Sequence, residues 1–123
     1  MESMKRVVSI AEGAEYREMG GVIKRLVHPS TVGSVNIGLS VAFLQPGEKV
    51  RRHRHVSEEV YFVLSGEGVM FLEDHEEIVL RKDVCVYVPS NAEHGQRCTG
   101  DEPLVLVAAL APPLTTPPTF TEA

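Results

Sequence analysis

The sequence predicts an all-β protein built as an antiparallel sandwich or barrel, and three observations lead to this fold class. About nine short apolar runs are separated by frequent turn signals, which is the pattern of strands in sandwiches and barrels. Residues 34–44 alternate with a clean period of two, as a strand with one buried face does. No stretch shows the apolar periodicity of an amphipathic helix.

The first 34 residues are expected to form an N-terminal arm. The apolar run at 7–10 predicts an edge strand, Gly20-Gly21 predicts a break, and residues 22–27 predict a second short strand. His28 precedes Pro29 in an expected turn. We therefore interpret His28 as a surface histidine rather than a ligand.

The strand at 34–44 is predicted to bury its larger side chains. The residues expected to face the core are Val35, Ile37, Leu39, Val41 and Phe43. The strand ends at Gln45-Pro46-Gly47, where proline fixes φ and glycine permits a positive φ, so a tight turn follows.

The second half of the chain predicts further short strands at 60–64, 69–72, 78–80, 84–88 and 104–110. His75 lies in an acidic turn at 73–77 and is expected to be solvated. Residues 111–123 contain four prolines, so this tail is expected to be extended or disordered unless a neighbour covers it.

The stretch at 47–66 carries a pattern of metal-ligating residues. His53 and His55 stand two apart, so on a strand both imidazoles point to the same face, and Glu59 has the same parity. Residues 56–58 interrupt the strand pattern between them. Two imidazoles and a carboxylate without thiolates suit a divalent transition metal better than a structural zinc ion.

The spacing of this stretch carries a family resemblance. Gly47, His53, His55, Glu59 and Gly66 occupy every fixed position of the first motif of the cupin superfamily. The chain therefore resembles a small single-domain cupin of the conserved-barrel type. The resemblance implies a double-stranded β-helix, or jelly-roll barrel, over residues 35–110.

The second cupin motif is present in part. Pro89 is followed five residues later by His94, which the resemblance implies is the fourth metal ligand. The family pattern has glycine where this chain has Asp83 and Asn91, and asparagine where it has Cys98. Aspartate and asparagine tolerate left-handed backbone conformations, so the first two replacements are physically mild.

The implied ligand set is His53, His55, Glu59 and His94, holding one divalent ion of Fe, Mn, Ni, Co, Cu or Zn, which the sequence does not rank. An octahedral ion with four protein ligands keeps two positions open for water, dioxygen or a chelating substrate. Such an ion acts as a Lewis acid that polarises a carbonyl or stabilises an enolate.

Three further residues are candidates for contact with a substrate. Gln96 lies two residues beyond His94, Tyr61 shares the parity of Glu59, and Arg51 shares the parity of His53. Each has a structural alternative. Gln96 can be a surface glutamine, Tyr61 a packed wall of the barrel, and Arg51 a solvated residue at the rim.

Two classes of function follow from these residues. The first is a metal-dependent enzyme acting on a small oxygen-bearing molecule, either an oxygenase or an isomerase, lyase or cyclase working through an enolate. The second is a non-catalytic module that binds and senses a small ligand such as a sugar or organic acid. The ligand set favours the enzyme. No G-x-S-x-G motif or phosphate-binding glycine loop is present.

Composition restricts the expected partners. Twelve Lys and Arg stand against 17 Asp and Glu, a net charge of −5, so the basic run at 51–55 lacks the broad positive field that nucleic acid requires. No apolar stretch is long enough to cross a bilayer. The absence of a secretory signal predicts a cytoplasmic protein in which Cys85 and Cys98 stay reduced.

A homodimer is expected because the edge strands of a small barrel need cover. The apolar side of the N-terminal arm is one element that could cover the sheet edge of a neighbouring copy.

Overall fold

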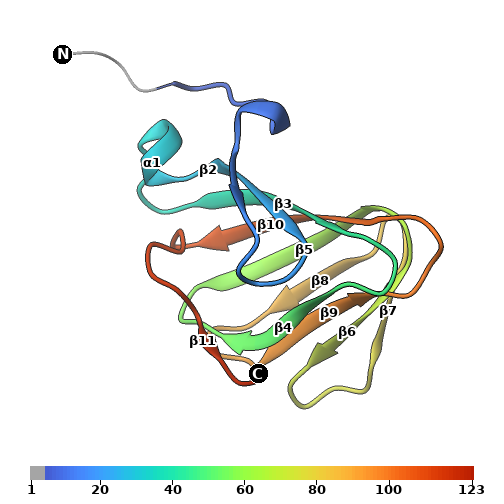
Figure 1. Ribbon diagram of the computed structural model, residues 1–123. Coiled ribbons are helices and arrows are strands. Elements are labelled where there is room, and N and C mark those ends of the chain that lie inside the picture. The colour runs from blue at the N-terminus through green and yellow to red at the C-terminus, as the bar shows by residue number, and fades with distance from the viewer. Residues whose placement is uncertain (1–4) are drawn as a thin grey trace.

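The computed structural model describes residues 5–123, and its chain forms two antiparallel sheets that enclose a common interior (Figure 1). The six-stranded sheet has the order β1 (Ala14–Tyr16), β2 (Val22–Val27), β3 (Gly38–Leu44), β10 (Leu104–Ala111), β5 (Glu58–Ser65) and β8 (Cys85–Val88). The five-stranded sheet has the order β11 (Thr119–Phe120), β4 (Lys49–Arg54), β9 (His94–Cys98), β6 (Gly68–Leu72) and β7 (Ile78–Leu80). The predicted all-β, double-stranded β-helix is confirmed.

The apolar core lies between the inner faces of the two sheets. Its fully buried side chains are Leu44, Val63, Met70, Leu80, Val88, Leu104 and Leu106. On β5 and β10 these residues alternate with more exposed ones, because successive side chains of a strand point to opposite faces.

The strand β3 differs from its prediction in length and in the face that it buries. It begins at Gly38, and Val35 and Ile37 lie before it with 78% and 54% of their surface exposed. Of the predicted set, Val41 is buried at 4% exposure, whereas the core cluster receives Ala42 and Leu44, which have the opposite parity. A period of two identifies a strand, but both faces of this one carry apolar residues, so the period does not say which face is inside.

The predicted edge strand at 7–10 is wrong. A short 3₁₀ helix, η1 (Ile10–Glu12), begins there, and the Glu12 carboxylate accepts hydrogen bonds from the backbone N–H and the hydroxyl of Ser9. A serine followed three residues later by a glutamate is a capping signal. The chain then enters β1, which pairs with β2, and β2 pairs with β3 of the same barrel.

The C-terminal segment is covered by its own barrel. β11 pairs with β4, Pro113 is buried, and the Glu122 carboxylate accepts hydrogen bonds from Lys49 Nζ and the Arg52 N–H, each at 2.8 Å. Figure 1 shows this segment, in red, passing from β10 to β11 beside β4. The proline-rich tail is thus extended and tied to the five-stranded sheet.

Four positions of the two cupin motifs adopt the left-handed backbone conformation. Gly47 and Gly66 have φ of 84° and 83°, and Asp83 and Asn91 have φ of 73° and 65°. The two replaced motif glycines therefore keep the glycine-like conformation, as expected for aspartate and asparagine. No helix in the described part of the chain is long and apolar enough to span a membrane.

Candidate metal centre

A β-bulge in β4 places His53 in the barrel. β4 pairs with β9 so that Val50 lies opposite Gln96 and His53 lies opposite His94. Three steps along β4 therefore match two steps along β9, which means that β4 carries one extra residue. The extra residue reverses the parity of the strand, so Val50 and His53 both point inward.

Four buried side chains meet at this point. His53 and His94 come from paired strands, Glu59 comes from the start of β5, and His55 comes from the connection between β4 and β5. Their exposed fractions range from 0% for His94 to 8% for His55. One potential ligand atom from each lies within 4.8 Å of every other. The structure thus brings together all four residues of the implied ligand set.

Backbone carbonyls fix the orientation of the three imidazoles. Each Nδ1 lies 2.7–2.9 Å from a carbonyl oxygen, that of Arg51 for His53, Ser57 for His55 and Ala92 for His94. A carbonyl oxygen only accepts, so each Nδ1 carries the proton. Each Nε2 of the neutral ring therefore keeps its lone pair, and such a second set of contacts orients histidine ligands in metal sites.

The spacing of the donor atoms fits a metal ion. Glu59 Oε1 lies 3.1 Å from the Nε2 atoms of both His55 and His94. Two ligands at right angles on one ion, each at a bond length of about 2.1 Å, are separated by about 3.0 Å. The Nε2 of His53 is buried without a hydrogen-bond partner among the described residues. A cation between these atoms would satisfy all of them.

The charge states of His53 and Glu59 suit a cation, and at His55 a cation would compete with a proton. Burial, with a smaller contribution from His94, lowers the pKa of His53 to about 4, so its ring is neutral at pH 7. Burial alone would raise the pKa of Glu59, but the two histidines lower it to about 2. Burial lowers the pKa of His55, whereas Glu59 outweighs this effect and the pKa is raised. A metal requires the carboxylate ionised and the imidazoles neutral.

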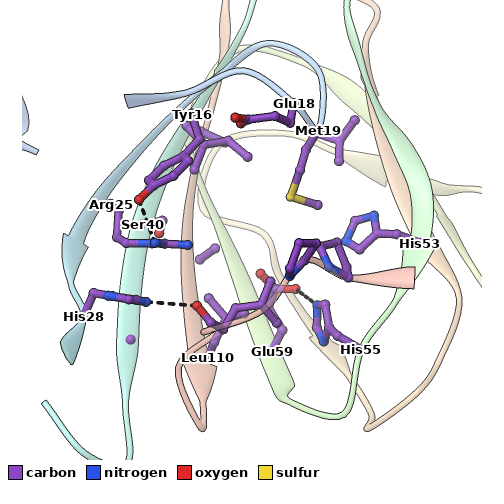
Figure 2. A pocket seen from close by; sticks show the side chains of 18 of the residues that line it. Tyr16, Glu18, Met19, Arg25, His28, Ser40, His53, His55, Glu59 and Leu110 are labelled. Atoms are coloured by element: carbon purple, nitrogen blue, oxygen red, sulfur yellow. Dashed lines mark hydrogen bonds and ion pairs between the residues drawn. The ribbon is translucent and has the colours of Figure 1, made fainter. Parts of the chain in front are cut away.

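The cluster opens into a cavity of about 380 Å³ (Figure 2). His53, His55 and Glu59 form part of its lining, whereas the fully buried His94 does not. Much of the remaining wall is apolar, contributed by Met19, Ile23, Val27, Leu39, Ala42, Val50, Ala108, Leu110, Leu114 and Phe120. Residues from the N-terminal strands and from the C-terminal segment thus close a cavity whose four-residue cluster comes from the barrel.

Of the three candidate substrate-contacting residues, Gln96 and Tyr61 line the cavity and Arg51 does not. Gln96 lines the cavity and is 3% exposed, which excludes the surface alternative, and neither atom of its amide group has a partner among the described residues. Tyr61 also lines the cavity. Burial, and after it the Glu59 carboxylate, raise the pKa of Tyr61 well above its usual value, so it remains a phenol.

Arg51 does not line the cavity. Its parity with His53 is irrelevant because it lies in the bulge. Its guanidinium stacks 3.8 Å from the ring centre of Phe120 and donates a hydrogen bond to the Glu18 carbonyl oxygen. Arg51 therefore joins the N-terminal and C-terminal segments at the rim.

Replacing Gln96 by leucine should stabilise the fold and impair ligand binding. An unsatisfied buried amide costs about 1 kcal/mol or more, and leucine of similar volume removes that cost. We expect the free energy of unfolding in urea to rise by about 1 kcal/mol. Gln45→Leu, at an exposed position, is the control. A loss of stability in Gln96→Leu would show that the amide is satisfied in solution and has no spare hydrogen-bonding capacity.

The expectation that His28 is a surface residue is wrong. His28 is 8% exposed and lines the cavity. Its Nδ1 accepts the Ser30 N–H at 3.0 Å, so Nε2 carries the proton and donates to the Leu114 carbonyl at 2.9 Å. The signal for this role was the sequence His28-Pro29-Ser30, since proline is common at the first position of a helix and the preceding residue caps it. The helix is α1 (Pro29–Val32).

The remaining histidine and the cysteines take no part in the cluster. His75 is exposed, as predicted. Cys85 is exposed, and Cys98 is buried with its thiol donating to the Glu102 carbonyl oxygen; both are free thiols. The asparagine of the family motif is thus replaced by a side chain that does not line the cavity.

Comparison with known proteins identifies relatives in several reaction classes. Polyketide synthase CurC of Streptomyces cyaneus is 35% identical over 114 residues, which cover 91% of this chain and 73% of that protein. An uncharacterized protein of Methanocaldococcus jannaschii is 34% identical over 95 residues, covering 76% and 75%. More distant are a dimethylsulfoniopropionate lyase of Ruegeria pomeroyi (32% over 74 residues) and a gentisate 1,2-dioxygenase of Streptomyces (29% over 112 residues), of whose lengths this chain covers 47% and 30%.

Solved structures show the same fold. The polyketide cyclase RemF from Streptomyces resistomycificus superposes with a TM-score of 0.78 at 16% identity, covering 98% of this chain and 87% of that one. The family model for the cupin domain matches residues 40–110, more than half of the chain and the whole of the histidine cluster. On this match and on the barrel that carries it, the chain belongs to the cupin family.

Proposed function

We propose that the protein is a metal-dependent enzyme acting on a small oxygen-bearing molecule, with one divalent transition metal ion held by His53, His55, Glu59 and His94. The observation that carries this proposal is the convergence of three Nε2 atoms and one carboxylate oxygen beside a cavity. Three imidazoles with one carboxylate accept Fe, Mn, Ni, Co, Cu or Zn.

The favoured reaction class is proton transfer beside a carbonyl group, as in an isomerase, lyase or cyclase. A bound divalent ion supplies Lewis acidity that stabilises negative charge on a substrate oxygen. The protein supplies a largely apolar cavity, an amide on Gln96 that both donates and accepts hydrogen bonds, and a proton on the Tyr61 hydroxyl. The relatives named as a polyketide synthase protein and a lyase support this class, and the gentisate dioxygenase supports an oxygenase as the second candidate.

One observation favours a non-catalytic module for a sugar or organic acid. Outside the cluster, the only carboxylate among the described cavity-lining residues is Glu18, which is exposed, and Tyr61 is not a base. A cavity with few proton acceptors suits binding as well as turnover.

The two functions are distinguished by metal analysis and assay of untagged protein. Protein loaded with each metal in turn is incubated with β-diketones and dihydroxyaromatic acids, while oxygen uptake and product formation are followed. The enzyme proposal requires turnover by one loaded form and its loss in Glu59→Gln. Saturable binding of a compound without turnover in any form supports the module.

We further propose a cytoplasmic homodimer. Val7 and Ile10 are 82% and 44% exposed on a single chain, so these two apolar side chains of the arm have no cover within the described structure. Sedimentation should give a single species of twice 13.5 kDa at micromolar concentration. A monomer would contradict the proposal.

The arm can be tested separately from the dimer. Val7→Asp with Ile10→Asp should dissociate the pair. Phe62→Asp, on the outer face of β5 where Phe62 is 36% exposed, is the matched control. If Phe62→Asp dissociates the dimer and the arm variant does not, the outer sheet face is the interface instead.

A further inference from the structure

The wall of the cavity opposite the histidine cluster carries a second group of polar residues. Figure 2 shows Tyr16, Arg25 and His28 on one side of the cavity and His53, His55 and Glu59 on the other. β2 directs Ile23, Arg25 and Val27 into the cavity, and Arg25 lies opposite Ser40 of β3.

The positive charge of Arg25 is not neutralised by the protein. No carboxylate of residues 5–123 lies within 4.0 Å of its guanidinium, although the side chain is only partly exposed. Glu18 lines the same cavity, but its exposed side chain accepts a hydrogen bond from the Arg17 backbone N–H instead. A half-buried guanidinium without a counter-ion is poised for an anionic group of a ligand.

Tyr16 holds this guanidinium in place. Arg25 Nη1 donates to the Tyr16 hydroxyl at 2.7 Å, and the guanidinium carbon lies 4.2 Å from the centre of the same ring. Because the phenol oxygen accepts this bond, its own O–H can donate to a third group. The remaining N–H groups of Arg25 and the Tyr16 hydroxyl are thus donors available to one ligand.

His28 is excluded from this subsite. Its Nε2 proton is already donated to the Leu114 carbonyl, and its Nδ1 accepts the Ser30 N–H. His28 therefore fixes the wall rather than the ligand.

We propose that Arg25 and Tyr16 form a carboxylate-binding subsite, so that the natural ligand carries a carboxylate at one end, an apolar middle and an oxygen-bearing group at the metal end. The middle is set by the apolar wall between the two groups, which includes Met19, Ala42, Ala108 and Leu110. The placement of the oxygen-bearing group at a metal ion rests on the proposed function. The inference of a ligand carboxylate depends only on Arg25 and Tyr16.

The test compares two compounds that differ by one carboxylate. Benzoylacetone and its 4-carboxy derivative are titrated calorimetrically into metal-loaded and metal-free protein. The wild type should bind the carboxylated compound at least about tenfold more tightly in both forms, which is the value of one charged hydrogen bond. Arg25→Gln should abolish this preference and leave the affinity for benzoylacetone unchanged.

Matched variants separate binding from folding. Lys24→Gln removes the same charge from the neighbouring position of β2, which does not line the cavity, and should keep the full preference. Arg25→Lys should retain part of it, and Tyr16→Phe, which keeps the ring but loses the hydroxyl, should weaken it.

Two results would overturn the subsite. The first is an equal preference in the wild type and Arg25→Gln. The second is that the wild type shows no preference or does not bind the carboxylated compound at about 1 mM. Failure of the metal proposal gives a different result. Metal loading would then leave the affinities for both compounds unchanged, while the preference for the carboxylated compound would still depend on Arg25.

Discussion

The His94→Ala variant is expected to bind its divalent metal at least about a hundredfold more weakly than the wild-type protein, because changes merely beside a metal ligand already cost up to that factor. His94 is fully buried, and its imidazole is fixed by the Ala92 carbonyl, so alanine removes one of the four oriented donors of the cluster. Competition against a chromophoric chelator measures the dissociation constant, and elemental analysis measures the metal content of the purified protein.

The control for this loss is His75→Ala. His75 is exposed on the turn between β6 and β7 and should leave the metal affinity unchanged. Glu59→Gln provides a second comparison, since it keeps the shape of the side chain and removes the charge. Full metal binding by both His94→Ala and Glu59→Gln would refute the four-ligand centre.

Removal of the metal should lower the melting temperature by about 10 °C. An ion that binds only the folded state, at a hundredfold excess over its dissociation constant, contributes about 2.7 kcal/mol. For a chain of 123 residues the entropy of unfolding is about 0.26 kcal/mol per kelvin, which converts this energy into the stated shift. Calorimetry before and after dialysis against a chelator measures it.

The shift in melting temperature on metal removal should also depend on the four proposed metal-ligating side chains. His94→Ala should melt at the same temperature with and without chelator, and restoring the metal to the wild type should restore its melting temperature. An unchanged wild-type melting curve after verified metal removal would mean that the ion contributes nothing to folding.

Local patterns predicted the barrel because the signals of a strand, apolar alternation and flanking turn residues, lie within a few residues of one another. The apolar runs and turn glycines located most strands, and the motif spacing located all four residues of the cluster. The left-handed conformations of Asp83 and Asn91 followed from their side-chain chemistry.

What the sequence could not predict depends on contacts between distant segments. The bulge in β4 appears only in its register with β9, so the parity of Arg51 was misleading. The burial of His28 depends on Leu114, which lies 86 residues away. The inward face of β3 was misjudged because both of its faces carry apolar residues, and only contacts with the rest of the barrel place Ser40 and Ala42 on the cavity side.

The residues that line the cavity come from two kinds of segment, those inside and those outside the part of the chain that matches the family. The cluster lies within the residues 40–110 that match the family, whereas Tyr16, Arg25, His28 and the segment from Leu114 to Phe120 lie outside them. Exchange of these flanking segments between relatives would therefore replace much of the cavity wall and leave the four-residue cluster unchanged. A chimaera with the barrel of this protein and the flanks of another cupin is expected to keep the proposed metal affinity and to change its ligand preference.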